Sequence, residues 1–160
     1  MRVTLYHPVL LPVQGYGGVE RVVWWLAKGL SELGYSVSIA ARAGSLVPEG
    51  VALLPLETCD ESELIVSLLR AGGCELLHFM APPKANTIAE LNANRIRTAV
   101  TVHGNGKMGE VFAENTVFLT RDHASRHGAE AFVYNGIDPD ELRYDPRARN
   151  DSFVFLSRTS

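Results

Sequence analysis

Cysteine is scarce in this chain. Cys59 and Cys74 are the only two among 160 residues, and they stand apart, without Cys-x-x-Cys spacing or a histidine cluster beside them. Structural zinc sites and redox-active dithiols depend on such spacing. We therefore expect reduced thiols in a cytoplasmic protein, and no metal site.

The sequence also lacks a long apolar run and a run of like charges. Residues 1–14 are apolar but too short to cross a bilayer, and they have neither the basic start nor the small-residue cleavage site of a signal peptide. Lysine and arginine number 15 against 18 acidic residues, a net charge of -3, and no basic patch is visible. We expect no nucleic-acid partner and at most peripheral contact with a membrane.

The residues that are present indicate an α/β protein. The composition, 46% apolar and 21% charged, is that of an ordinary globular domain. Short runs rich in β-branched residues alternate with longer segments of helical period, which is typical of a Rossmann-like, mainly parallel sheet with helices on both faces. The strands that this pattern predicts are residues 3–6, 37–41, 51–54, 75–79, 99–103, 117–119 and 132–134.

Three helices are predicted between these strands. The first carries an apolar stripe from Val19 to Leu33 and ends at Gly34, a residue suited to a left-handed cap. The second begins near Asp60 and ends at residues 72–73, and the third follows two prolines at 82–83. The residues expected to point inward from the second and third helices are Leu64, Leu68, Leu69, Ile88 and Leu91.

The pattern changes after residue 134. Residues 135–140 are rich in turn formers, the segment that follows is polar and charged like a linker, and residues 153–156 form a new apolar run. We expect the Rossmann-like domain to occupy residues 1–144. Residues 145–160 would then be a linker and the first strand of a further domain that is absent here or supplied by a partner.

A glycine-rich loop precedes the first predicted helix. Gly15, Gly17 and Gly18 allow the backbone to approach a ligand closely, and the start of a helix favours an anion such as a phosphate. The dinucleotide-binding fingerprint is incomplete, because Glu20 stands where its third glycine belongs and the loop after residue 6 is too long for the tight turn. Arg42, at the end of the second strand, leaves NADP binding open as an alternative.

Several short phrases of the chain resemble the family-4 retaining glycosyltransferases, in that family's order. Residues 17–21 and 34–37 resemble its opening glycine loop and the end of its first helix, with Tyr35 in place of a usual histidine. Residues 75–78 resemble its Asp-hydrophobic-hydrophobic-His strand, residues 101–104 its Thr-x-His strand end, and residues 135–138 its Asn-Gly-Val-Asp turn. Residues 153–158 resemble the strand that opens its second domain, with Ser157 at the usual glycine.

This resemblance implies one half of a GT-B fold, in which two Rossmann-like domains face a cleft. The expected partners are a C-terminal domain of the same protein that binds a nucleotide sugar, the nucleotide-sugar donor itself, and an acceptor of unknown identity. The activity would be sugar transfer with retention, by front-face attack and without a metal or another cofactor. The chain alone would be inactive or nearly so.

The resemblance also implies roles for individual residues. His103 would be catalytic, close to the reacting sugar and the acceptor hydroxyl, whereas His78 is expected in the core. The other assignments are Gly17, Gly18 and Arg21 facing the donor phosphates, Tyr16, Gly104, Asn105 and Lys107 on the acceptor side, and Asn135 and Asp138 in the interdomain turn.

Two other functions remain open at this point. The fold is compatible with a binding module that recognises an acceptor or a partner subunit without catalysis. It is also compatible with an NADP-dependent oxidoreductase built on the same sheet.

Overall fold

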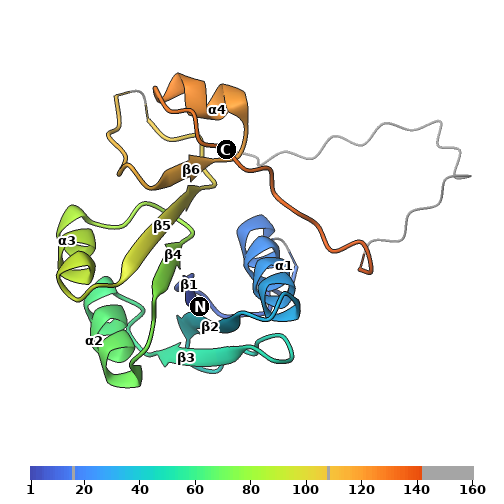
Figure 1. Ribbon diagram of the computed structural model, residues 1–160. Helices are drawn as coiled ribbons and strands as arrows, with labels where there is room; N and C mark the ends of the chain where they lie inside the picture. Colours follow the sequence, from blue (N-terminus) through green and yellow to red (C-terminus); the bar gives the residue numbers. More distant parts are fainter. Residues whose placement is uncertain (16, 108, 142–160) are drawn as a thin grey trace, which may run out of the picture.

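The computed structural model describes residues 1–15, 17–107 and 109–141, and it confirms an α/β, Rossmann-like fold (Figure 1). Its sheet has six strands, and every neighbouring pair is parallel. The strands are β1 (Arg2–Tyr6), β2 (Ser36–Arg42), β3 (Ala52–Leu56), β4 (Leu76–Phe79), β5 (Arg97–Val102) and β6 (Thr116–Phe118). Tyr16 and the linker and strand predicted within 145–160 lie outside the described residues.

The strand order defines where the chain reverses its direction across the sheet. The order is β3-β2-β1-β4-β5-β6, so the first three strands run outward from β1 to one edge and the last three run from β4 to the other. The switch therefore falls between β1 and β4. In open α/β sheets, ligands bind outside the carboxyl ends of the strands at such a point.

One face of the sheet is covered by α1 (Gly18–Glu32). Its Val23 and Ala27 are buried against residues of β1 and β2, among them Leu5 and Ile39. At the end of the helix the Gly34 N–H donates to the Ser31 carbonyl and the next N–H donates to the Leu30 carbonyl, with Gly34 at a φ of 84°. This is the predicted left-handed cap, in the Schellman arrangement.

The opposite face is covered by α2 (Glu61–Ala71), α3 (Ala85–Ala93) and α4 (Arg121–Arg126), as Figure 1 shows for α2 and α3. The Asp60 side chain caps α2 by accepting from the Glu63 N–H. The second hydrophobic core lies beneath these helices and includes Leu64, Phe79 and Phe118. No helix in the described ranges is both long and apolar enough to cross a membrane.

Some of the sequence predictions need correction. The strand predicted at 132–134 does not form. A single parallel bridge pairs Phe132 with Phe118 of β6 instead. Leu69 is 47% exposed, whereas its neighbour Leu68 is buried, so the inward face of α2 is narrower than expected. Strand β3 continues through Pro55, which an edge strand tolerates because a proline there removes no bond to a further strand.

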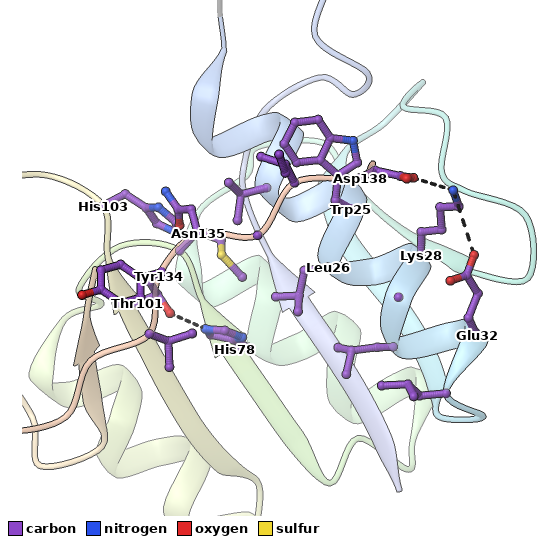
Figure 2. Close-up of a pocket in the computed structure, with 18 of the residues that line it drawn as sticks. Trp25, Leu26, Lys28, Glu32, His78, Thr101, His103, Tyr134, Asn135 and Asp138 are labelled. Atoms are coloured by element: carbon purple, nitrogen blue, oxygen red, sulfur yellow. Dashed lines mark hydrogen bonds and ion pairs between the residues drawn. The ribbon is translucent and has the colours of Figure 1, made fainter. Parts of the chain in front are cut away.

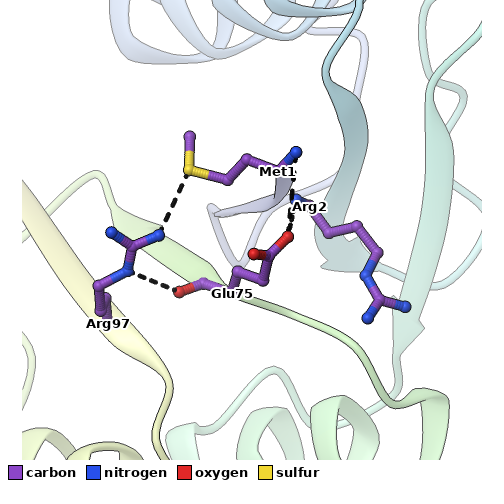
Figure 3. A network of polar contacts seen from close by, with 4 residues as sticks. All are labelled: Met1, Arg2, Glu75 and Arg97. Carbon is purple, nitrogen blue, oxygen red and sulfur yellow. Dashed lines mark hydrogen bonds and ion pairs between the residues drawn. The ribbon is translucent and has the colours of Figure 1, made fainter.

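Polar contacts join three strands at the amino end of the sheet (Figure 3). One Glu75 carboxylate oxygen accepts from the Arg2 N–H at 2.7 Å and lies 3.9 Å from the terminal amine of Met1. The Arg97 side chain donates to the Glu75 carbonyl. The hydrogen bond from Arg2 is the main reason that the pKa of Glu75 is lowered. The segment before β4 is thus tied to the starts of β1 and β5, at the end of the sheet opposite the switch-point ligand position.

The two adjacent leucines of α2 allow a matched test of this packing. Leu68→Ala should lower the free energy of unfolding by about 2–5 kcal/mol, because it removes a buried side chain and leaves a cavity. Leu69→Ala should change it by no more than about 0.5 kcal/mol, since that side chain is already half in solvent. Urea unfolding of both variants measures the difference, and equal losses would contradict the orientation of α2.

Candidate functional site

Two histidines directly follow strands at the carboxyl edge of the sheet. His7 comes after β1 and His103 after β5, with Met80 between them after β4. The predicted strand end at His103 is thus one residue too long, since β5 ends at Val102. His7 lies at the switch point, where the topology favours a ligand, and His103 lies farther along the same edge, after β5.

His7 faces the carboxylate of Glu20 in the first turn of α1. The His7 Nε2 lies 3.7 Å from the Glu20 Oε1, too far for a hydrogen bond, and it has no hydrogen-bond partner among the described residues although it is buried. Burial lowers the pKa of His7, and the nearby Glu20 carboxylate opposes that shift. The ring is therefore neutral at pH 7 beside a negative charge.

His103 is close enough to His7 for the two rings to interact electrostatically. Its pKa is lowered first by burial and then by the charge that a protonated His7 would carry. Its Nε2 is likewise buried without a partner in the described part of the chain. A buried polar atom without a hydrogen bond is costly, and in native proteins it is explained by strain, by a catalytic role or by a bound water or ion.

The glycine loop meets the same cluster at the start of α1. A Cβ atom on Gly17 would lie 2.8 Å from the Glu20 Oε2 and 2.5 Å from a Val13 methyl group, so a larger residue there would require both side chains to shift. Gly17 is the N-cap residue and has no side chain with which to cap the helix. A Cβ atom on Gly18 would meet only open space. The first-turn N–H groups therefore remain available to a ligand. Arg21 folds back and donates to the Gly15 carbonyl at 3.0 Å.

A large pocket extends from His103 along α1 (Figure 2). It has a volume of about 720 Å³ and lies between one side of α1, the uncovered face of β4, β5 and β6, and residues 133–140. Its apolar walls include Leu26, Met80 and Val117. A volume of this size and a mainly apolar lining with few polar groups are typical of small-molecule sites.

His78 and Thr101 supply polar groups on the sheet side of this pocket. The His78 Nε2 and the Thr101 Oγ1 lie 2.8 Å apart and share a hydrogen bond. Burial, with a smaller effect from the nearby His103, lowers the pKa of His78 to about 4. His78 was expected in the core, but it lines the pocket as a neutral, hydrogen-bonded ring.

The segment after Phe132 forms the third side of the pocket, and one ion pair ties it to α1. Asp138 accepts from the Lys28 Nζ of α1, and this contact raises the pKa of Lys28 and lowers that of Asp138. The other Asp138 oxygen accepts from the Asp140 N–H at 2.9 Å, which is an Asx turn. Asp138 therefore shapes a local turn, and Asn135 lines the pocket farther back. That this turn leads to a second domain stays a prediction.

The loop after His103 is held by α4. The Asn105 carbonyl lies 2.9 Å from the His127 Nε2, and a Cβ atom on Gly106 would collide with that ring. Lys107 is exposed, and its N–H donates to a Glu110 carboxylate oxygen. Gly104 is exposed and borders open space. None of these predicted acceptor-side residues lines the pocket, so their role stays a prediction.

The sequence interpretation missed two members of the switch-point cluster, His7 and Glu20. The sequence assigns no role to His7, and it marks Glu20 only as the residue in place of the third glycine of the dinucleotide fingerprint. One signal was present: His7 and His103 both directly follow an apolar strand, so a parallel sheet brings both to one edge.

The side chains of the described residues form no group of three or more histidine, cysteine or acidic residues that suits a metal ion.

Comparisons with known proteins give likenesses in structure. No family model and no curated protein sequence matches the chain. The fold is similar to AviGT4, a glycosyltransferase involved in avilamycin A biosynthesis, with a TM-score of 0.66 and 20% sequence identity. The likeness covers 89% of this chain and 44% of AviGT4, so the chain spans less than half the length of that protein. At this identity the likeness establishes the fold.

Acidification should test the buried state of His78. Its pKa of about 4 lies below the value near 6.5 of an unfolded chain, so the unfolded state binds more protons between these values. The stabilisation is complete above pH 6.5 and is lost as the pH falls towards 4. Between about pH 7 and about pH 4.5, the free energy of unfolding should fall by roughly 2–3 kcal/mol more in the wild type than in His78→Gln. Equal losses in urea unfolding would contradict a neutral, buried His78.

Removal of Asp138 should release the segment that closes the pocket. In Asp138→Ala, Lys28 loses its partner and the Asx turn loses its acceptor, so the amides of residues 133–141 should exchange with solvent severalfold faster. Asp140→Ala is the matched control, because the bonding group of Asp140 is its backbone N–H. Hydrogen exchange with mass spectrometry measures both, and unchanged exchange in Asp138→Ala would show that the ion pair does not hold the segment.

Proposed function

We propose that the chain is the N-terminal, acceptor-side half of a GT-B glycosyltransferase. The complete enzyme would move a sugar from a nucleotide-sugar donor to an acceptor hydroxyl with retention at the anomeric carbon. The reaction would need no metal ion or other cofactor and would take place in the cytoplasm. A C-terminal domain of the same protein would bind most of the donor.

The observation that carries this proposal is a set of groups that the fold gathers at the carboxyl edge of the sheet. His103 interacts with His7, His7 faces Glu20, and the Glu20 carboxylate lies against Gly17 at the start of α1. This set combines neutral imidazoles with uncapped backbone N–H groups at the edge where such folds bind ligands. The likeness to a glycosyltransferase gives this fold a precedent for sugar transfer.

Each part of the edge has a role in the proposed reaction. The N–H groups at Gly17 and Gly18 would face the diphosphate as it leaves, so that the helix dipole offsets part of its growing charge. Arg21 holds the glycine loop through Gly15 and keeps further N–H donors for the phosphates. His103 would hydrogen-bond the reacting groups through its unpartnered Nε2.

The acceptor would approach from the side of the loop after β5. Gly104, Asn105 and Lys107 are exposed there, and Tyr16 is assigned to the same side by the resemblance alone. The segment with Asn135 and Asp138 would lead to the second domain. Because the likeness covers 44% of AviGT4, transfer by these 160 residues alone is not expected.

Two alternatives remain as outcomes of the test. A binding module without catalysis would bind an acceptor or partner and transfer nothing. An NADP-dependent oxidoreductase is disfavoured, because the segment between β1 and α1 spans residues 7–17 and Glu20 replaces the third glycine. A titration of NADPH fluorescence that stays flat would remove it.

The proposal predicts activity only when the donor half is present. The chain should be assayed alone and joined to the C-terminal domain encoded with it, against a panel of nucleotide sugars, for transfer and for donor hydrolysis. We expect activity from the joined protein, and a loss of about 10²–10³-fold in kcat for its His103→Ala variant.

Glu90→Gln is the control for this loss. Glu90 is exposed on α3, which covers the face of the sheet opposite the pocket. It should keep near wild-type kcat once unfolding curves show that both variants are folded. If the joined protein binds its partner but neither transfers nor hydrolyses any donor, the binding module takes the place of the enzyme.

A further inference from the structure

The pocket beside α1 extends along the helix and reaches the carboxyl edge of the sheet (Figure 2). Its α1 wall runs from Val22 to Leu33, a rise of about 16 Å along the helix axis. Met80, directly after β4, and His103, directly after β5, line its end at the edge. A molecule that lies along α1 therefore has one end where the proposed reaction takes place.

The walls of this pocket are mostly apolar. Leu26 of α1 and Val117 of β6 face the hollow from two sides. The segment after Phe132 adds three apolar side chains that are 61%, 67% and 63% exposed: Val133, Tyr134 and Ile137. Exposed apolar surface that is gathered around one hollow is typical of a ligand groove or an interface. A ligand with an apolar body would remove this surface from water.

The polar side chains near the edge bring no charge into the pocket. Burial lowers the pKa of His103 and lowers that of His78 to about 4, so both rings are neutral at pH 7. The His78 Nε2 and the Thr101 Oγ1 already share a hydrogen bond. This end of the pocket therefore suits an uncharged group.

The charged side chains gather on the side of the pocket away from His103, as Figure 2 shows. Lys28 is the only cationic side chain among the described residues that line the pocket, and it is paired with Asp138. Glu32 lies 4.0 Å from the same ammonium, and the Asp140 carboxylate is also near it. Three carboxylates thus surround one cation, and an anionic ligand would be repelled.

We infer that this pocket binds the body of the acceptor, and that the acceptor is a neutral, mainly apolar molecule with its reacting hydroxyl at the His103 end. This inference rests on the proposed function. It adds the chemical class of the acceptor, which neither the resemblance nor the likeness in structure assigns. A phosphorylated or otherwise anionic body is excluded from the pocket by the charges that line it.

This placement is compatible with the proposed transfer. The oxygen of the hydroxyl forms a bond to the anomeric carbon of the donor, while the bond from that carbon to the diphosphate oxygen breaks and its electron pair leaves on the diphosphate. In a front-face transfer the proton of the hydroxyl passes to the leaving phosphate oxygen. The pocket therefore contributes position and the exclusion of water, and none of its side chains has to accept a proton.

Binding is tested on the chain as it stands, with three fluorescent coumarins that share one apolar body. 4-Methylumbelliferone is neutral at about pH 6, where a phenol keeps its proton. Its methyl ether is neutral and lacks the hydroxyl, and its sulfate ester is an anion. In fluorescence titrations both neutral compounds should bind at least about tenfold more tightly than the sulfate. Equal or tighter binding of the sulfate, or no binding of any of the three, would overturn the inference.

A matched pair of variants locates the bound coumarin. Val117→Trp fills the pocket from β6, whereas Val66→Trp makes the same change at an exposed position of α2, on the opposite face of the sheet. The first should raise the Kd of the neutral coumarins about tenfold, the effect of roughly 60 Å² less apolar surface buried by the ligand. The second should leave the Kd unchanged. Equal Kd values in the two variants would place the ligand elsewhere and refute the inference.

A second pair covers the case in which Val117→Trp does not fold, which urea unfolding would show. Val133 is 61% exposed and lines the pocket, so Val133→Asp adds a charge to the wall without disturbing a packed side chain. It should weaken binding of the neutral coumarins severalfold, and Val66→Asp should not. Unchanged binding in Val133→Asp would count against the pocket.

The role in transfer is tested in the joined protein, with any nucleotide sugar that it hydrolyses or transfers. 4-Methylumbelliferone should be glycosylated, and Val117→Trp should lower kcat/KM for this acceptor about tenfold while donor hydrolysis stays at the wild-type rate. An equal fall in hydrolysis and transfer would contradict a separate site for the acceptor body.

The outcomes separate the inference from the proposed function. If the joined protein no longer binds the coumarins, or transfers sugar to hydrophilic acceptors and not to 4-methylumbelliferone, the glycosyltransferase stands and the acceptor class is wrong. If the joined protein neither transfers nor hydrolyses any donor, the proposed function fails. The titrations of the chain alone then decide whether the pocket binds a neutral, apolar ligand.

Discussion

The two-residue period of the parallel strands decides which side chains meet in this protein. On β1, β4 and β5, alternate residues such as Leu5, Phe79 and Val100 divide between the two cores. The register pairs Leu5 with His78 and His78 with Ala99, so these three residues point to the same face of the sheet, the face covered by α1. Every second residue after each of them points to that face too. That face therefore receives the pocket and switch-point groups that come from the sheet: His7, His78, Met80, Thr101, His103 and Val117. A slip of one residue in any strand would place its polar groups in the core beneath α2 and α3.

Incomplete coverage of that face explains why it tolerates these polar residues. Helix α1 packs on β1 and β2, whereas residues 133–140 approach the remaining strands without a described helix beneath them. The histidines there are buried enough to stay neutral, as the lowered pKa of His78 indicates, yet open to a ligand-sized space. This face therefore combines buried polar groups with an open space beside them, as ligand sites do.

The sequence was sufficient for the fold and insufficient for the site, for a physical reason. Periodicity identified six of the strands, α1 and its Gly34 cap, because these depend on local spacing and backbone conformation. The strand expected at 132–134 was wrong, because a strand also needs a neighbouring strand to pair with. Here only Phe132 pairs with β6, through Phe118. His103 was singled out from its phrase, whereas the contact of His7 with Glu20 depends on how α1 returns over β1. No spacing along the chain encodes that three-dimensional contact.

The electrostatics of this edge limit what the described residues can bind by themselves. A helix start contributes roughly half a positive charge, and the full negative charge of Glu20 lies directly against it. Protonating His7 or His103 would offset that charge, but burial disfavours both cations. A diphosphate is therefore weakly attracted to the described residues alone, and most of its charge would have to be met by cationic groups of a facing domain. A neutral hydroxyl has no such requirement, so this charge distribution agrees with the proposed function, in which the chain would bind the acceptor and a second domain would bind the donor.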